Sequence, residues 1–156
     1  MKIHLIAVGT RMPDWVTEAV EEYTRRMPPD LKLDLLEIPA GQRGKKMDAV
    51  TAKRVEGEKM LAAIPAGCQV IALDVQGKSW STEKLAEQIS RWMQDGRDVA
   101  LLVGGADGLD ASCLARADLR WSLSALTFPH PLVRVILAEQ FYRASSILKN
   151  HPYHRG

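Results

Sequence analysis

Three segments that follow Leu73 in the chain have the residue types of a small-molecule site. One follows Leu73, a second contains Gly104 and Gly105, and a third runs from Leu123 to Phe128. Each comes after a short apolar run, and glycine lets a flat ligand approach the main chain closely. Because the carboxyl ends of parallel strands meet at one edge of a sheet, we expect a loop-built pocket for an adenine-type ligand.

These loops lack the sequence motifs of phosphate-binding proteins and of hydrolases. The glycine loop fits neither G-x-G-x-x-G nor a P-loop, and Ser122 and Ser124 lie outside a Gly-x-Ser-x-Gly elbow. His151 and His154 flank a proline, with no carboxylate or cysteine near them in the sequence. We therefore expect no metal site, no bound triphosphate and no serine nucleophile.

Apolar runs alternate with helical patterns along the whole chain, and these elements must position the loops. The run Val99–Val103 is apolar at every position, which is typical of a central strand in a parallel sheet. The alternation predicts one α/β domain over residues 1–156, with a mostly parallel sheet and helices on both faces. The expected strands span 3–8, 31–38, 70–73, 99–103 and 121–125; the expected helices lie between Pro13 and Pro28 and over 49–63, 82–95, 111–117 and 131–148.

The composition is that of an ordinary globular protein and excludes several classes. Hydrophobic residues make up 46% of the 156 residues, yet no apolar run approaches the roughly 20 residues of a membrane span. Met1–Gly9 lacks the apolar segment of a signal peptide, so we expect a cytoplasmic protein. Cys68 and Cys113 are far apart in the sequence, so neither a disulfide scaffold nor structural zinc is expected.

Basic residues gather in two parts of a chain whose net charge is only +2. One group surrounds Lys45 and Lys46, and the other lies between Arg134 and Arg155. Each group fits a solvated basic surface as well as it fits an RNA contact. Lys45, Lys46 and Arg155 are the candidates for RNA binding.

The chain resembles the SPOUT-class RNA methyltransferases over its full length. The most specific segments are 123–127 with Pro129-His130, then 139–144 and 151–155. The resemblance implies S-adenosylmethionine as cofactor, a carboxy-terminal trefoil knot, and a homodimer with sites completed across or near the subunit interface. It also implies methylation of N3 of a pseudouridine in large-subunit (23S) ribosomal RNA, on the assembled ribosome.

The cofactor residues that the resemblance implies lie in the three loops found from the residues themselves. Both lines of reasoning place an adenine edge and a bent cofactor against main-chain groups at strand ends. The residues are Leu73, Gly104, Gly105, Leu123, Ser124, Ala125, Leu126, Thr127 and Phe128.

Methylation of a ring nitrogen needs a proton acceptor and benefits from a cation near the developing anion. Arg143 is a candidate for that cation or for a phosphate contact, and equally for a surface salt bridge with Glu139 four residues earlier. Tyr153 and His154 are candidates for orienting the base or moving the proton, the alternative being a frayed terminus. His130 fits a proton acceptor and a loop hydrogen bond equally well.

Two other functions fit the sequence. The first is a SPOUT methyltransferase acting on another ribosomal base or on transfer RNA. The loops indicate which cofactor is bound more than which RNA is methylated, so they do not exclude such a target. The second is a non-catalytic ribosome-binding assembly factor that kept the fold. The presence of all three cofactor loops argues against the second.

Overall fold

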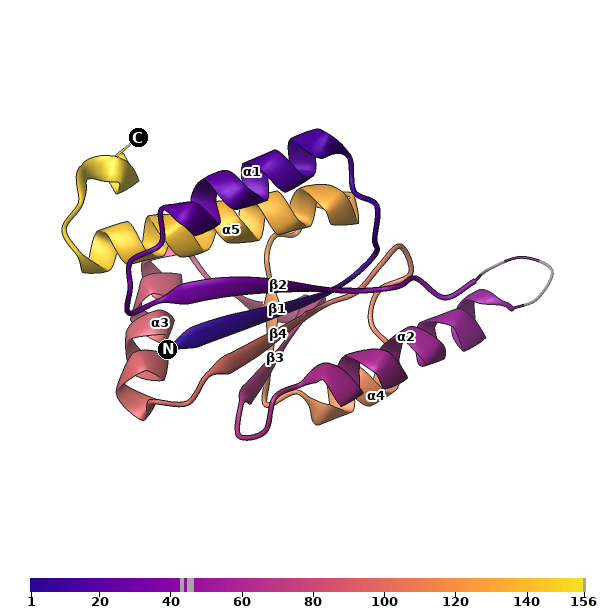
Figure 1. Cartoon of the computed structure of the whole chain (residues 1–156). Helices are drawn as coiled ribbons and strands as arrows, with labels where there is room; N and C mark the ends of the chain where they lie inside the picture. Colours follow the sequence, from indigo (N-terminus) through magenta and orange to yellow (C-terminus); the bar gives the residue numbers. More distant parts are fainter. Residues whose placement is uncertain (43, 45–46, 156) are drawn as a thin grey trace.

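The structure, a computed structural model, describes residues 1–42, 44 and 47–155. Among these residues, five parallel strands form one sheet in the order β2-β1-β4-β3-β5 (Figure 1). The elements are, in chain order, β1 (Lys2–Val8), α1 (Asp14–Arg25), β2 (Lys32–Ile38), α2 (Ala49–Ala63), β3 (Gln69–Ser79), α3 (Thr82–Asp95), β4 (Val99–Val103), α4 (Ala111–Arg116), β5 (Leu119–Ser122), α5 (His130–Leu148) and the 3₁₀-helix η1 (Pro152–Arg155).

Two apolar layers cover the sheet, because successive side chains of a strand point to opposite faces. In β1, Leu5 joins the core beneath α1, α3 and α5, whereas Ile6 joins the core beneath α2 and α4. Figure 1 shows these helices on the two sides of the sheet. The central strand β4 is buried at every position, as its uninterrupted apolar sequence requires. The predicted α/β fold with a parallel sheet and helices on both faces is confirmed.

Local signals set the ends of the helices. At the start of α3, the Oγ atom of Ser81 accepts a hydrogen bond from the amide of Lys84 at 3.0 Å. Gly96 ends the same helix with a left-handed φ of 83°, a conformation that favours glycine. Asp48 caps α2 through the amide of Thr51 at 2.7 Å. These ends lie within one residue of those predicted.

The strand β3 is longer than predicted. We expected it to end at Leu73, with a loop over Asp74 to Lys78, but it continues to Ser79. Leu73 and Lys78 both pair with Trp121, so the four residues between them bulge out of the ladder. At the end of the bulge, a Cβ on Gly77 would lie 2.6 Å from main-chain atoms of β5, so only glycine lets the strand return there.

The strand β5 is shifted toward the amino terminus relative to the prediction of 121–125. It ends at Ser122 because two local hydrogen bonds then turn the chain. The hydroxyl of Ser122 donates to the carbonyl of Ser124 at 3.3 Å, and the amide of Leu126 donates to the hydroxyl of Ser124 at 3.0 Å. The whole segment Leu123–Phe128 is therefore free to form a loop before α5.

The two ends of the sheet carry different parts of the chain. All five strands run in one direction, so their carboxyl ends share an edge, toward the right of Figure 1. The helix α5 starts beside this edge and runs back across the sheet, so η1 lies at the opposite end. This polarity decides which of the predicted site residues can meet within one chain.

Candidate functional site

Two adjoining cavities lie at the carboxyl edge of the sheet. The larger, of about 560 Å³, is lined by the glycine loop and by the segment leading into α5. The smaller, of about 130 Å³, shares Leu73, Thr127 and Phe128 with it. A few hundred cubic ångströms is the usual size of a small-molecule site. The predicted cofactor residues lining the two cavities are Leu73, Gly104, Gly105, Leu123, Ser124, Leu126, Thr127 and Phe128; Ala125 lies in the same loop but lines neither.

The glycine loop forms one wall of the larger cavity, and it packs too tightly for a side chain at Gly104. A Cβ on Gly104 would lie 2.4 Å from the carbonyl carbon of Gly108, across the turn that joins Gly105 to Gly108. A Cβ on Gly105 would lie 3.0 Å from the side chain of Val8 in β1. The loop is thus folded flat against the sheet, and the cavity wall offers peptide groups rather than side chains. This arrangement fits the edge of an adenine ring and leaves room for a bent cofactor.

His130 lines the larger cavity at the first position of α5. Burial of its ring, and then the Arg134 guanidinium, lower the pKa of His130 below its usual value. The imidazole is therefore neutral near pH 7. A neutral ring beside the cavity avoids charge repulsion with a cationic ligand and keeps one ring nitrogen as an acceptor.

Arg134 is a residue whose role the sequence analysis missed. Only 1% of its side chain is exposed. Its Nη2 atom donates to the carbonyl oxygens of Val8 at 3.2 Å and Gly9 at 2.6 Å, and its Nη1 atom donates to Glu37 at 2.6 Å. The guanidinium thus ties α5 to the ends of β1 and β2 beside the cavity. A signal was present in the sequence, because Arg134 interrupts the apolar stretch 132–137 and a charged side chain within such a stretch is rarely buried without a partner.

The catalytic candidates Arg143, Tyr153 and His154 line another cavity, of about 650 Å³, near the end of α5. The Nε atom of Arg143 donates to Glu139 at 2.7 Å, and the guanidinium lies 4.7 Å from the centre of the Tyr153 ring. The Nη1 atom of Arg143 also reaches the carbonyl of His154 at 3.4 Å. The tail is therefore a docked 3₁₀-helix rather than a frayed end. The salt bridge expected as an alternative role of Arg143 is present.

The protonation states in this cluster distinguish its candidate bases. Burial, with added contributions from Tyr23 and Glu139, raises the pKa of Tyr153, so its hydroxyl stays protonated near neutral pH. The hydrogen bond to Glu139 raises the pKa of Arg143, which keeps its charge. The Nδ1 atom of His154 lies 2.7 Å from the carbonyl of His151 and must donate to it. In the neutral ring Nε2 then carries the lone pair, so His154 is the better proton acceptor.

The two groups of candidates do not meet within one chain. His130 begins α5 beside the larger cavity, and Arg143 lies more than three turns further along the same helix. At 1.5 Å per residue, this places Arg143, with Tyr153 and His154 (the Arg143 cluster), about 20 Å from the cofactor loops. Figure 1 shows the tail and the loop edge at opposite ends of the sheet. One chain therefore has the predicted cofactor residues at one end of the sheet and the predicted catalytic residues at the other.

Of the candidates for RNA binding, only Arg155 can be placed. It lies exposed in η1, next to His154. Lys45 and Lys46 lie outside the described residues. Arg155 thus adds a free-standing positive charge to the end of the molecule that carries the Arg143 cluster.

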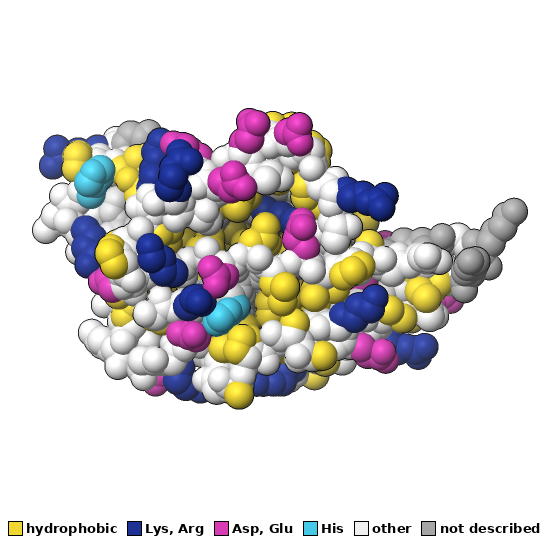
Figure 2. Space-filling view, viewed as in Figure 1, with side chains coloured by type: hydrophobic (Ala, Val, Ile, Leu, Met, Phe, Trp, Pro, Cys, Tyr) yellow, Lys and Arg dark blue, Asp and Glu magenta, His cyan; other side chains and the backbone are white. Residues whose placement is uncertain are grey.

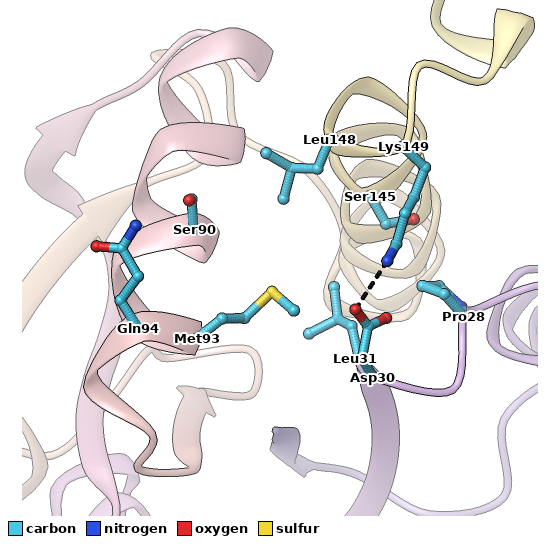
Figure 3. Close-up of a pocket in the computed structure, with 9 residues that line it drawn as sticks. All are labelled: Pro28, Asp30, Leu31, Ser90, Met93, Gln94, Ser145, Leu148 and Lys149. Carbon is cyan, nitrogen blue, oxygen red and sulfur yellow. Dashed lines mark hydrogen bonds and ion pairs between the residues drawn. The ribbon is translucent and has the colours of Figure 1, made fainter.

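A further cavity, of about 350 Å³, lies between the ends of α3 and α5 (Figure 3). Its wall is apolar, with Met93 and Leu148 facing one another across it. At its side Lys149 forms an ion pair with Asp30 at 2.8 Å. It contains no residue predicted for the site, and its charged groups neutralise each other. It is therefore a weaker candidate than the loop cavities.

Two searches of the described ranges, 1–42, 44 and 47–155, bear on other site types. No group of three or more histidine, cysteine, aspartate or glutamate side chains there is arranged to bind a metal ion. No helix in those ranges has the length and apolar character needed to cross a bilayer. The loop cavities and the Arg143 cluster therefore carry the functional argument.

A family model described as "Predicted SPOUT methyltransferase" matches residues 1–154. The chain belongs to the SPOUT methyltransferase family. It is 59% identical, over 99% of its own length and 100% of the relative's, to "Ribosomal RNA large subunit methyltransferase H" of Marinomonas sp. (strain MWYL1).

Solved structures share the fold of this chain without close sequence similarity. A probable methylase family protein of Haemophilus influenzae Rd KW20 matches 97% of this chain and 69% of its own, with a TM-score of 0.57 and 12% identity. A probable methyltransferase of Bordetella pertussis Tohama I matches 91% of this chain and 95% of its own, with a TM-score of 0.56 and 16% identity. At such identities these two structures show the fold alone.

SPOUT methyltransferases use S-adenosylmethionine, so family membership gives the cofactor. The loop cavities fit this molecule by their size, their glycine-lined wall and the apolar side chains of Leu73 and Phe128. The uncharged His130 also fits, because the sulfonium is a cation. We therefore propose that these loops form the cofactor site.

The glycine wall of this SPOUT site leads to a prediction. We expect Gly104→Ala to weaken S-adenosylmethionine binding at least about tenfold. The new Cβ would clash with main-chain atoms of the loop, which, unlike the end of a flexible side chain, cannot move aside without changing the shape of the loop. Isothermal titration calorimetry measures the affinity. Gly67→Ala is the control for backbone strain alone: its Cβ would meet open space, but alanine is strained at the φ of 82° found there. This variant should lose some stability and still bind the cofactor normally. Unchanged affinity in Gly104→Ala would remove this loop from the site.

Proposed function

We propose that this protein transfers the methyl group of S-adenosylmethionine to N3 of a pseudouridine in large-subunit (23S) ribosomal RNA. The observation that carries the proposal is the 59% identity, over essentially both full chains, to a protein named a large-subunit ribosomal RNA methyltransferase. The resemblance of segments 123–127, 139–144 and 151–155 narrows the target to pseudouridine N3. The assembled ribosome is the proposed substrate and the cytoplasm the proposed location.

The residues of the chain have distinct tasks in this reaction. The cofactor supplies a methyl group already activated by the sulfonium, so no protein nucleophile is needed. The Arg143 guanidinium stabilises the anion that develops when N3 loses its proton. His154, through Nε2, accepts that proton, and the protonated Tyr153 hydroxyl orients the base. Lys45, Lys46 and Arg155 contact the RNA backbone.

A homodimer is part of the proposal, because it would bring the two halves of the site together. The helix α5 leaves Leu132 and Ile136 partly exposed, one turn apart on a face that continues to Arg143. A helix that is apolar on the solvent side is normally covered by another surface. An isologous contact between antiparallel copies of α5 would set the Arg143 end of one chain beside the cofactor loops of the other.

The neighbouring surface also favours a partner. Leu35 and Leu36 on β2 and Trp15 on α1 are exposed by 37%, 45% and 54%. Figure 2 shows hydrophobic side chains gathered across the middle of this face of the molecule, around a hollow. Large apolar side chains that are exposed to solvent are typical of surfaces that a second protein covers.

The composite arrangement can be tested with subunits of two kinds. A chain ending at Pro152 should fold and bind the cofactor but lose methylation by at least about a hundredfold, because it lacks Tyr153 and His154. The Gly104→Ala chain has an intact tail but weakened cofactor loops, so it should lose most of its activity when the cofactor is kept at or below the wild-type Kd. Co-expressed with separate affinity tags and purified as a mixed dimer, the two should recover up to about half the wild-type rate. One site of that dimer combines intact loops with an intact tail.

The controls for this experiment are the two homodimers, each purified alone. Activity only in the mixed dimer supports a site shared between chains. An inactive mixed dimer made from two folded chains would show that each chain acts alone. A truncated chain that fails to fold, judged by circular dichroism, would contradict the role given to the tail.

The remaining parts of the proposal concern chain topology. We propose that residues 1–156 form a single SPOUT domain and that its carboxy-terminal half is tied in a trefoil knot, as family membership implies. Threaded chains are rare in proteins, so sequence rules alone argue against a knot. The loop Leu123–Phe128 would then owe its fixed shape to the chain that passes it.

Two measurements test the function and its alternatives. Mass spectrometric mapping of 23S ribosomal RNA, from cells with and without the protein, should show one N3-methylpseudouridine that depends on it. A dependent methyl group elsewhere, on another ribosomal base or on transfer RNA, would favour the second methyltransferase hypothesis. Failure to bind S-adenosylmethionine in calorimetry would favour a non-catalytic assembly factor.

A further inference from the structure

Glu139 joins Arg143 and Tyr153, two of the three catalytic candidates that line the cavity near the end of α5. Its Oε1 atom accepts from the Nε atom of Arg143 at 2.7 Å and from the hydroxyl of Tyr153 at 3.1 Å. Arg143 lies on the same helix, whereas Tyr153 arrives from η1 after the chain has turned back. A single carboxylate oxygen therefore fixes the distance between a helix residue and a tail residue.

The other oxygen of the carboxylate is fixed as well. Oε2 accepts from the side-chain amide of Gln140 at 2.9 Å, and the Oε1 atom of Gln140 accepts from the hydroxyl of Thr82 at 2.8 Å. Thr82 is the first residue of α3, whose start is capped by Ser81. Both oxygens of the carboxylate are therefore hydrogen-bonded, and Gln140 connects Oε2 to the start of α3 through Thr82.

An ordinary i,i+4 salt bridge on a helix surface does not need this arrangement. Such pairs contribute little when both groups are solvated, and they require no third partner. Here the side chains of Arg143 and Glu139 are only 23% and 18% exposed. The Arg143 guanidinium is also stacked on the ring of Tyr153, so displacing one of the three groups displaces the others.

We infer that Glu139 is a positioning residue for methyl transfer, which acts by setting Arg143 and Tyr153 in a fixed relation to the target base. The inference rests on the proposed function. Glu139 does not touch the base or the cofactor. Its hydrogen bond to Nε holds the Arg143 guanidinium in the orientation needed to stabilise the anion of the base. Its second hydrogen bond, from the Tyr153 hydroxyl, fixes the position of that hydroxyl.

The first test is kinetic and uses large subunits isolated from cells that lack the protein. Glu139→Ala should lower kcat about 10- to 100-fold, as loss of alignment does, with cofactor affinity within about twofold of wild type. In an Arg143→Ala background the same change should cost much less, because Glu139 acts through Arg143. Glu87→Gln, which alters an exposed carboxylate of α3 paired with Lys84, is the control and should not change the rate.

The second test does not depend on activity. The Glu139 carboxylate disfavours ionisation of the Tyr153 hydroxyl, so Glu139→Gln should lower the pKa of Tyr153. The change is read from the ¹³Cζ resonance of labelled tyrosine, assigned with Tyr153→Phe. Because glutamine keeps the shape of the side chain, this variant also serves where Glu139→Ala does not fold.

The outcomes separate this inference from the proposed function. A wild-type protein that does not methylate 23S ribosomal RNA overturns the function itself. Normal wild-type methylation with an unchanged rate in Glu139→Ala and Glu139→Gln overturns the role of Glu139 alone. Additive losses in the double variant, or a parallel loss of cofactor affinity, would show that Glu139 only stabilises the fold.

Discussion

Arg134→Ala should lower the free energy of unfolding by about 3 kcal/mol, a large loss for a single change to a charged side chain. The guanidinium is buried and satisfies the carbonyl oxygens of Val8 and Gly9. Alanine leaves both carbonyls without that donor, opens a cavity beneath α5 and removes the partner of Glu37. Chemical denaturation followed by circular dichroism, at one fixed protein concentration, measures the change.

The control for Arg134 is Arg91→Ala, an exposed arginine in the middle of α3. It should change stability by no more than about 0.5 kcal/mol. Arg134→Ala should also raise the pKa of His130, because the guanidinium is one of the two causes that lower it. A variant as stable as wild type would show that water satisfies the two carbonyls and that Arg134 is not a structural tie.

Most of the fold followed from patterns that are local in the sequence. The uninterrupted apolar run of β4 required a strand covered on both faces, and the structure buries all of it. Ser81 and Gly96 marked the ends of α3, because capping depends on a few neighbouring residues. The loops around the cofactor cavity were found for the same reason, since each follows a strand that could be recognised.

What the sequence did not reveal depends on contacts between distant elements. The bulge in β3 exists because Leu73 and Lys78 compete for the same partner in β5. In α1, Trp15, Ala19 and Tyr23 recur at helical spacing, and so do Val16 and Val20. In the structure Val16 and Val20 are buried, whereas Trp15 is exposed. A shift of one residue rotates the buried face by about 100°, and only the position of the helix on the sheet decides between the two.

The separation of the two halves of the site could have been inferred but was not. A helix expected over 131–148 already implies about 20 Å between its two ends. The cofactor loops precede that helix, and Arg143, Tyr153 and His154 come near or after its end. Placing all of them in one site therefore requires a second chain to supply one half. The resemblance to SPOUT methyltransferases already implied a homodimer with sites completed across or near the subunit interface, and the mixed-dimer experiment tests that arrangement.

We expect Arg143→Ala to lower kcat for RNA methylation about 100- to 1,000-fold, as the loss of one preorganised charge does at other sites. Cofactor affinity should remain within about twofold of wild type, because the loops proposed to bind the cofactor line a different cavity. The hydrogen bond to Glu139 raises the pKa of Arg143, so the charge is present at any pH where the protein is folded. Single-turnover methylation of isolated large subunits and calorimetry provide the two measurements.

The pattern of kinetic change distinguishes the possible roles of Arg143. An arginine that stabilises the anion of the base affects kcat, whereas one that grips a phosphate raises KM for RNA and makes binding less sensitive to salt. Arg143→Lys keeps the charge but not the planar fork that contacts Glu139 and stacks on Tyr153, so it should recover only part of the rate. A full rate in Arg143→Ala, equal to that of the Arg91→Ala control, would leave Arg143 with its salt bridge to Glu139 as its sole function.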